Sequence, residues 1–199
     1  MREAATEETQ IPACMHLVQG GRWLLPTSDT GSVTYFDLDA SDPFPQNALI
    51  PDQFPSFKGM WTHMAVDVDR NSGLLAFNLA LSFCTSLDAL THPAQHSIQI
   101  WKVMLLRDDR QRGIGLTAEC LASFPQEPFI GHVYSLSLRG LHLALAVFCD
   151  ELEFPGRAFV VDWLQANGNL TDYRRRLVNP FEGGLGPVSQ VNSWDLKQS

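Results

Sequence analysis

Carboxylate and amide side chains alternate along one short stretch of the chain, in the order found at the start of a calcium-binding EF-hand loop. Asp67, Asp69 and Asn71 precede Gly73. An EF-hand loop requires a glycine at its sixth position and a bidentate glutamate at its twelfth. Counted from Asp67, the sixth position is a serine and the twelfth an asparagine. We therefore expect no calcium site in this stretch.

A β-hairpin accounts for the same residues better than a calcium-binding loop does. Valine alternates with aspartate over residues 66–69, which is the period-two pattern of a half-buried strand. Residues 70–73 supply the Asn and Gly that a turn favours, and residues 74–81 form an apolar stretch. The sequence thus predicts two strands joined by a tight polar turn.

This hairpin pattern occurs three times along the chain. Each copy has a histidine, a short alternating strand, a turn with glycine and an apolar strand. The copies span residues 16–25, 63–81 and 132–148. A third strand is expected at 31–39, 96–106 and 157–165, and a fourth at 47–54, 116–124 and 171–178. The chain is therefore expected to consist of repeated four-stranded units.

The ends of the third strands indicate which kind of repeat this is. "FD" ends at Asp37 and "VD" at Asp162, while Lys102 takes the corresponding place in the second unit. Four strands with a Gly-His near the start and an aspartate closing the third are typical of a β-propeller blade. Residues 15–178 resemble a degenerate WD40-like propeller. More narrowly, "LVQGGRWLL…GSVTYFDLD" and "IQIWKV" are similar to the propeller region of F-box-associated proteins.

The resemblance implies an all-β, antiparallel, WD40-like β-propeller of about three blades, which makes an incomplete ring because closed rings usually have four to eight. We expect residues 1–14 to be a disordered tail and 179–199 a coil or the start of a further blade. The chain is then part of a larger propeller, a shortened gene product, or a chain that completes itself by assembly. The first fifteen residues are too short and polar for an F-box.

Charge and composition exclude several classes of partner. The net charge of −8 disfavours binding to nucleic acid. We expect an intracellular protein, cytoplasmic or nuclear, because the polar N-terminus lacks the apolar core of a signal peptide and no apolar run is long enough to cross a membrane. The cysteines are far apart in sequence and are expected to be buried free thiols: Cys14, Cys84, Cys120 and Cys149.

The histidines that open the three copies are the first candidates for a metal site. We expect His16, His63 and His132 to occupy equivalent positions in separate blades, each packing and hydrogen-bonding within its own blade. No carboxylate or cysteine recurs beside them at ligand spacing. The sequence therefore predicts no metal and no cofactor.

Long loops with large aromatic residues are the candidate binding surface. In a propeller, the loops after the second and fourth strands of each blade meet at one rim. The aromatic residues expected in these loops are Phe57, Trp61, Phe129 and Phe154. Two interpretations stay open, because such residues either anchor a partner or cover the core beneath the loops.

No hydrolase, metalloprotease or phosphate-loop motif occurs in the sequence. We expect a non-enzymatic module that binds a protein partner, and the resemblance implies substrate or partner recognition for a ubiquitin ligase. One alternative is an enzyme with Asp67 or Asp69 at the central funnel. The other is a truncated gene product without its own activity.

Overall fold

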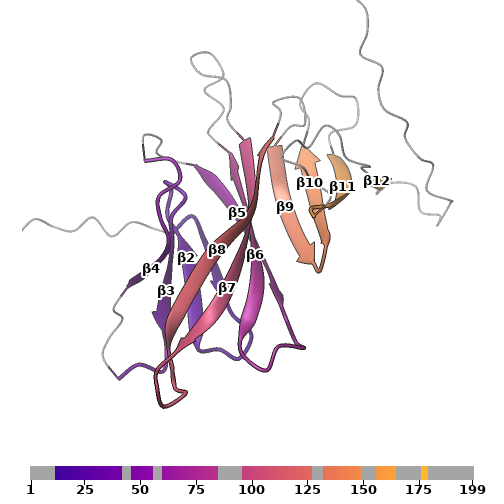
Figure 1. The fold of residues 1–199 in the computed structure, drawn as a ribbon. Helices are drawn as coiled ribbons and strands as arrows, with labels where there is room; N and C mark the ends of the chain where they lie inside the picture. Colours follow the sequence, from indigo (N-terminus) through magenta and orange to yellow (C-terminus); the bar gives the residue numbers. More distant parts are fainter. Residues whose placement is uncertain are drawn as a thin grey trace, which may run out of the picture.

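The computed structural model describes residues 12–41, 46–55, 60–84, 96–126, 132–148, 156–164 and 176–178. All regular structure in these stretches is β-strand, which confirms the predicted all-β class. The strands form three four-stranded antiparallel sheets that follow one another along the chain (Figure 1).

Each sheet takes four strands that are consecutive in sequence, so each is a simple meander. Sheet 1 contains β1 (Cys14–Leu17), β2 (Trp23–Thr27), β3 (Val33–Asp37) and β4 (Asn47–Ile50). Sheet 2 contains β5 (Trp61–Val68), β6 (Ala76–Cys84), β7 (His96–Arg107) and β8 (Gly113–Gln126). Sheet 3 contains β9 (His132–Arg139), β10 (His142–Phe148), β11 (Gly156–Asp162) and β12 (Arg176–Val178). The predicted hairpins, third strands and fourth strands correspond to these strands, with β1 beginning one residue before the boundary expected at 15. For the last fourth strand this holds over 176–178, because residues 171–175 lie outside the described part of the chain.

The hairpin predicted in place of a calcium loop is confirmed. β5 and β6 pair antiparallel, and the Asp69 amide donates to the Ala76 carbonyl at 2.9 Å. The Asp69 carboxylate accepts a hydrogen bond from the Asn71 amide at 2.9 Å, which orders the turn. No group of three metal-ligating side chains forms among the described residues.

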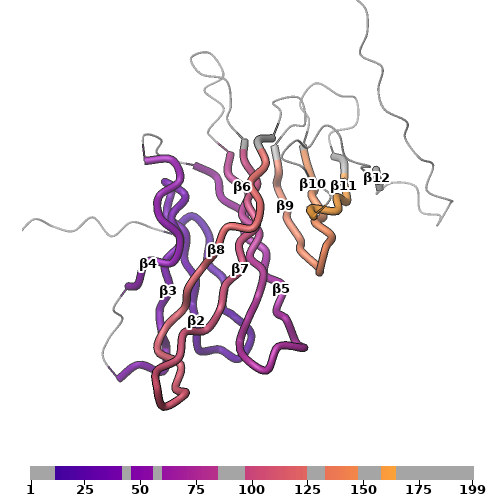
Figure 2. The backbone as a smooth tube through the Cα atoms, in the orientation of Figure 1, coloured from indigo at the N-terminus to yellow at the C-terminus, as the bar shows by residue number. Residues whose placement is uncertain are grey.

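Sheet 2 lies between the other two sheets, and each of its faces is buried against one of them (Figure 2). Core 1, between sheets 1 and 2, is formed by Trp23, Leu25, Val33, Tyr35, Ile50, Phe77, Leu79, Leu81, Phe83 and their neighbours. Core 2, between sheets 2 and 3, is formed by Ala80, Ile98, Ile100, Phe124, Leu143, Leu145, Val147, Val161, Trp163 and their neighbours. The sheets therefore associate face to face through apolar side chains.

Corresponding positions in the three sheets are defined by one repeated backbone bond. The amides of Leu38, Leu105 and Trp163 each donate to the carbonyl of the residue before the second strand. The residues just before these three amides are Asp37, Met104 and Asp162. Met104, two residues beyond Lys102, therefore occupies the aspartate position of sheet 2, and the expected equivalence of Lys102 is wrong. The turn between the first and second strands is longer in sheet 2 than in sheets 1 and 3. An alignment by sequence spacing alone therefore places the third strand of sheet 2 wrongly relative to the other two.

The histidines are not all equivalent either. His63 pairs with Ser82 and His132 with Phe148, and both partners lie six residues after the start of their second strand. His16 pairs with Leu25, which is only two residues after the start of β2. The position of His16 corresponds to that of Asp67, which pairs with Asn78. The expectation of one shared histidine position holds for two of the three.

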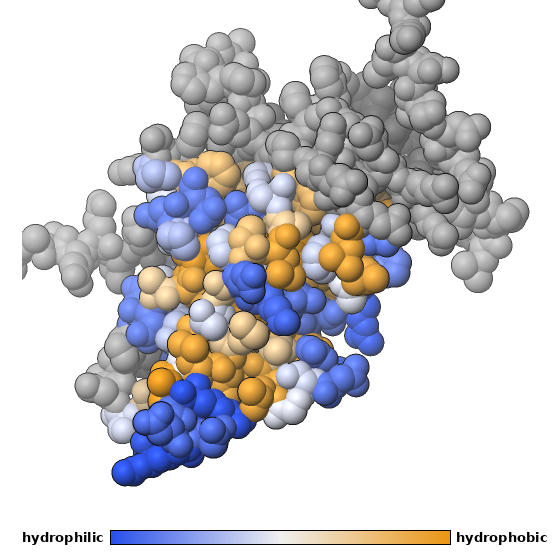
Figure 3. Space-filling view, viewed as in Figure 1, coloured by the Kyte–Doolittle hydropathy of each residue, from blue (hydrophilic) through white to orange (hydrophobic). Residues whose placement is uncertain are grey.

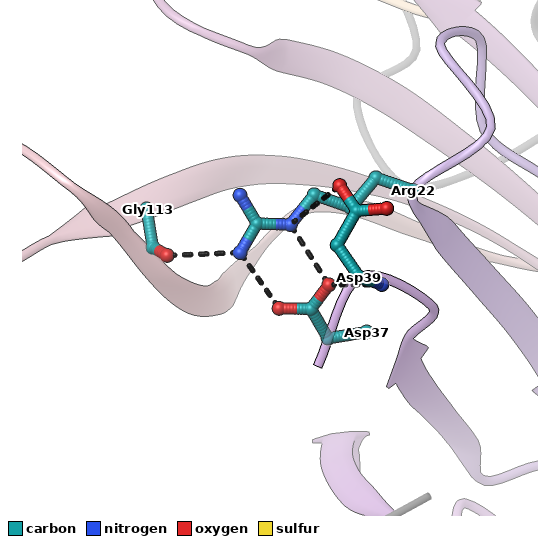
Figure 4. A network of polar contacts seen from close by, with 4 residues as sticks. All are labelled: Arg22, Asp37, Asp39 and Gly113. Atoms are coloured by element: carbon teal, nitrogen blue, oxygen red, sulfur yellow. Dashed lines mark hydrogen bonds and ion pairs between the residues drawn. The ribbon is translucent and has the colours of Figure 1, made fainter. Parts of the chain in front are cut away.

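One arginine joins sheets 1 and 2 (Figure 4). The Arg22 guanidinium donates to both carboxylate oxygens of Asp37, at 2.8 and 2.7 Å, and to the carbonyl of Gly113 on β8 at 3.0 Å. It also lies 4.6 Å from the centre of the Trp23 ring. Hydrogen bonding from Arg22 lowers the pKa of Asp37 below its usual value. Asp37, which closes the third strand, thus helps to hold the next sheet through Arg22.

The β7–β8 half of sheet 2 leaves apolar surface exposed. Figure 3 shows it over β7 and β8, above a hydrophilic end where the β7–β8 turn lies. Exposed large apolar side chains on these two strands are Met104, Leu106, Ile114 and Leu121. Cys120 on β8 is exposed as well, so the expectation of a buried thiol is wrong at this position. Cys84 is buried, and burial raises its pKa to about 11, whereas Cys149 lies outside the described residues.

Gly115 on β8 allows sheets 1 and 2 to approach closely. A Cβ atom at this position would lie 2.6 Å from the Tyr35 hydroxyl oxygen. Tyr35 is buried, and its ring packs edge-on against Trp23 with the ring centres 5.5 Å apart. Since the ring cannot move aside without disturbing core 1, a side chain at 115 must strain the contact.

We expect Gly115→Ala to lower the free energy of unfolding by about 1–3 kcal/mol through overpacking. Tyr35→Phe removes the hydroxyl and should restore most of that loss in the double variant. Gly73→Ala is the control, since a Cβ there meets nothing within 4 Å. Urea unfolding of the wild type, the two single variants and the double variant measures the coupling between positions 115 and 35, and the control is unfolded in the same way. Equal destabilisation with and without the hydroxyl would contradict this account.

Candidate functional site

The structure describes one of the four aromatic residues expected at the rim. Trp61 begins β5 and its side chain is 62% exposed. Phe57, Phe129 and Phe154 lie outside the described residues. Trp61 therefore does not cover the core, and its role as an anchor stays a prediction.

A cleft of about 240 Å³ opens at the other end of β5, where the first strands of the three sheets come together. We call it the first-strand cleft. It is lined by His16, Leu17 and Gln19 of sheet 1, by Val66, Asp67, Val68 and Arg70 of sheet 2, and by Arg139 of sheet 3. Seven strand steps separate Trp61 from Val68, about 24 Å at 3.4 Å per residue. The cleft and the rim are therefore different surfaces.

The position shared by His16 and Asp67 explains why polar groups meet here. Each faces the next sheet along the chain from near the end of a first strand. The Asp67 carboxylate accepts the Gly140 amide at 2.6 Å, which attaches the β9–β10 turn to sheet 2. Gly140 has a φ of +53°, a conformation that glycine adopts without strain. This contact brings the neighbouring Arg139 to the cleft.

The two arginines of the cleft differ from others in the chain. Arg22 is held by Asp37, and Arg112 pairs with Asp108 at 2.7 Å. Arg70 and Arg139 are exposed, and within the described part of the chain neither side chain has a hydrogen bond or an ion pair. Their guanidinium donors are thus available to a ligand.

Burial controls the charge of the two histidines at the first strands. It lowers the pKa of His16 below the ordinary value of 6.5, so the His16 ring in the cleft is neutral at pH 7. Burial also lowers the pKa of His63, against a hydrogen bond with the backbone of Val133 that raises it. Because Val133 lies on β9, His63 bonds across to sheet 3. The expectation that it bonds within its own sheet is wrong.

The carboxylates considered for catalysis have structural partners. Asp67 does line the cleft, but one of its oxygens accepts the Gly140 amide. Asp69 accepts the Asn71 amide in the turn. The cleft holds one carboxylate, one neutral imidazole and two guanidinium groups, and the guanidinium groups can donate hydrogen bonds to an anion.

Sequence reasoning missed the first-strand cleft as a site. The sequence pattern indicates Asp67 only as a rejected calcium ligand or a funnel carboxylate, and it assigns no role to Arg70 or Arg139. A weak signal was present, since Arg70 and Arg139 both fall in or beside the predicted hairpin turns. Only the pairing register shows that those turns meet at one end of the sheets.

Comparison with models of protein families and with curated proteins found no match. Among the described residues, no helix has the length and apolar character needed to cross a membrane. The site must therefore be interpreted from its own geometry.

The burial of His63 predicts how stability depends on pH. Its pKa is lower in the folded state than the ordinary 6.5, so the unfolded chain takes up a proton first as the pH falls. The stability of the folded state that depends on neutral His63 is fully present above pH 6.5, and it is lost as the pH falls from there towards the pKa of the folded state. His63→Gln cannot titrate and should flatten that part of the profile, measured by urea unfolding between pH 7.5 and 5, roughly the range in which histidine titrates. An unchanged pH dependence in His63→Gln would contradict this account. His16→Gln measures the separate contribution of His16 to the same pH dependence.

Proposed function

We propose that this chain is a non-enzymatic protein-interaction module whose three sheets are WD40-like propeller blades. The stacking of the sheets supports this proposal: each is a four-stranded meander, and sheet 2 is buried on both faces by its neighbours. Propeller blades have this meander and stack in this way around an axis lined by their first strands. β1 and β5 are adjacent, and so are β5 and β9.

The exposed aromatic at the rim is the observation that carries the interaction role. A tryptophan that is 62% exposed at a strand end costs solvation free energy unless a partner covers it. Tryptophan is also among the commonest anchors of protein interfaces. We propose Trp61 as one such anchor, with Phe57, Phe129 and Phe154 as the predicted remainder of the rim.

The class of partner follows from the resemblance alone. F-box-associated propellers recognise substrates or partners of a ubiquitin ligase, and a related role would make the partner of this chain a cytoplasmic or nuclear protein. Recruitment of the ligase adaptor belongs to the F-box in that family. We therefore expect the chain by itself to bind a target protein and not the adaptor.

We expect Trp61→Ala to weaken binding to a rim partner by about 30-fold or more, the loss typical of an anchor residue. Leu74→Ala is the control, because Leu74 is 44% exposed but lies in the turn at the other end of β5. Quantitative affinity capture with the wild type, Trp61→Ala and Leu74→Ala identifies proteins that Trp61→Ala alone fails to retain. Titration with the purified partner then measures the affinity of each chain. The rim proposal fails if no captured protein distinguishes Trp61→Ala from the control.

The blade proposal also predicts how the isolated chain behaves. Sheet 1 turns Cys14, His16 and Val18 towards sheet 2, whereas Met15 and Leu17 point the opposite way and are 60% and 52% exposed. In a propeller, that face would pack against a further blade.

We expect the isolated chain to self-associate through this face, because apolar surface without a partner sheet promotes association. Met15→Ser combined with Leu17→Ser should reduce the association. Ile114→Ser should not, although Ile114 on β8 is 62% exposed. Size-exclusion chromatography with light scattering at several concentrations tests this, and equal association of both variants would count against a free blade face.

A further inference from the structure

We propose that the first-strand cleft binds a carboxylate of an acidic protein segment between the guanidinium groups of Arg70 and Arg139. This site lies at the end of the sheets opposite Trp61 and is independent of the rim interaction proposed above. It is assigned from the shape of the cleft, from its charges, and from the hydrogen-bonding state of the groups that line it.

The charge of the cleft is opposite to that of the whole chain. Two arginines line it against one aspartate, so the cleft carries a net positive charge in a chain of net charge −8. His16 adds no positive charge at neutral pH, because burial lowers its pKa. A small positive cleft in an acidic protein attracts anionic groups locally while the remaining surface repels a polyanion. This favours one or two carboxylates of a peptide over a nucleic acid.

The guanidinium donors of the cleft are unused, in contrast to those of Arg22 and Arg112. Arg22 is held by Asp37 and Gly113, and Arg112 by Asp108. Arg70 and Arg139 have no such partner in the part of the chain that the structure describes. A guanidinium group presents a fork of donors that matches the two oxygens of a carboxylate. The pair can therefore bind a carboxylate without breaking an existing contact.

The size and walls of the cleft limit the ligand. About 240 Å³ is less than the usual volume of a site for a drug-sized molecule, so it accommodates a side chain rather than a cofactor. Val66 and Val68 supply apolar walls that pack against the methylene groups of a glutamate. Gln19 adds an amide at the edge. The arrangement therefore fits a glutamate within an extended acidic segment.

Asp67 allows a test in which removing a negative charge should strengthen binding. Its carboxylate lines the cleft and accepts the Gly140 amide, so it repels an incoming carboxylate while it holds the β9–β10 turn. Asp67→Asn removes the negative charge, and its amide oxygen can still accept the same hydrogen bond. This variant should bind an acidic peptide more tightly than the wild type.

The experiment uses the whole chain and a fluorescein-labelled hexaglutamate peptide, with a hexaglutamine peptide as the uncharged probe. Fluorescence anisotropy is measured at pH 7 in about 10 mM salt, where the Debye length is about 30 Å. We expect Arg70→Gln combined with Arg139→Gln to weaken hexaglutamate binding by about tenfold or more, which corresponds to two exposed ion pairs. Arg110→Gln removes an exposed arginine from the β7–β8 turn, which does not line the cleft, and should weaken binding far less than the double variant. Asp67→Asn should strengthen binding severalfold.

Several outcomes would overturn the proposal. These are wild-type affinity in the double arginine variant, no binding of hexaglutamate to the wild type, equal binding of hexaglutamine, or weaker binding by Asp67→Asn in a chain with unchanged thermal unfolding. Tighter binding of a labelled single-stranded oligonucleotide than of hexaglutamate would also overturn it, in favour of a nucleic-acid ligand. None of these results bears on Trp61, so failure of the cleft and failure of the rim are distinguishable.

Discussion

The burial of sheet 2 on both faces is the constraint on which the rest of the structure depends. β6 is buried along nearly its whole length, with Phe77, Leu79, Leu81 and Phe83 directed to core 1 and Ala80 to core 2. Sheet 2 cannot form an outer layer, because its core 1 face carries these large side chains of β6 and its core 2 face carries Ile98, Ile100 and Phe124. Sheets 1 and 3 supply the two covers. Each contributes one apolar face of its own, and the order of the three sheets in space follows from this requirement.

Polar contacts act at the ends of the sheets, where the apolar cores stop. Arg22 spans Asp37 and the Gly113 carbonyl between sheets 1 and 2, and the Asp67 carboxylate holds the Gly140 amide between sheets 2 and 3. Both contacts lie near hairpin turns, where backbone groups lack a partner in the sheet. Their geometry fixes how the turns of neighbouring sheets meet. The first-strand cleft is a consequence of that meeting, and its two arginines, which have no partner among the described residues, are the groups that these contacts leave available.

The two surfaces proposed here have different physical chemistry. The rim at Trp61 offers exposed aromatic area, which suits a partner that buries apolar surface. The first-strand cleft offers guanidinium donors in a small recess, which suits a single anionic side chain. The length of β5 separates the two, so one extended partner or two different partners can engage both surfaces. This division is consistent with the way repeated sheets present their two ends to solvent.

The sequence by itself determined the strands and their grouping. Alternating and continuous apolar patterns, together with glycine-containing turns, predicted three hairpins, three third strands and three fourth strands, because side-chain period and turn chemistry are local properties. The sequence did not determine register or contacts between sheets. Lys102 was aligned with the aspartates although Met104 occupies that position, and His16 was grouped with His63 although it corresponds to Asp67. Arg70 and Arg139 lie 69 residues apart in the chain, and only the tertiary structure, through sheet pairing and the Asp67–Gly140 bond, brings them to one cleft.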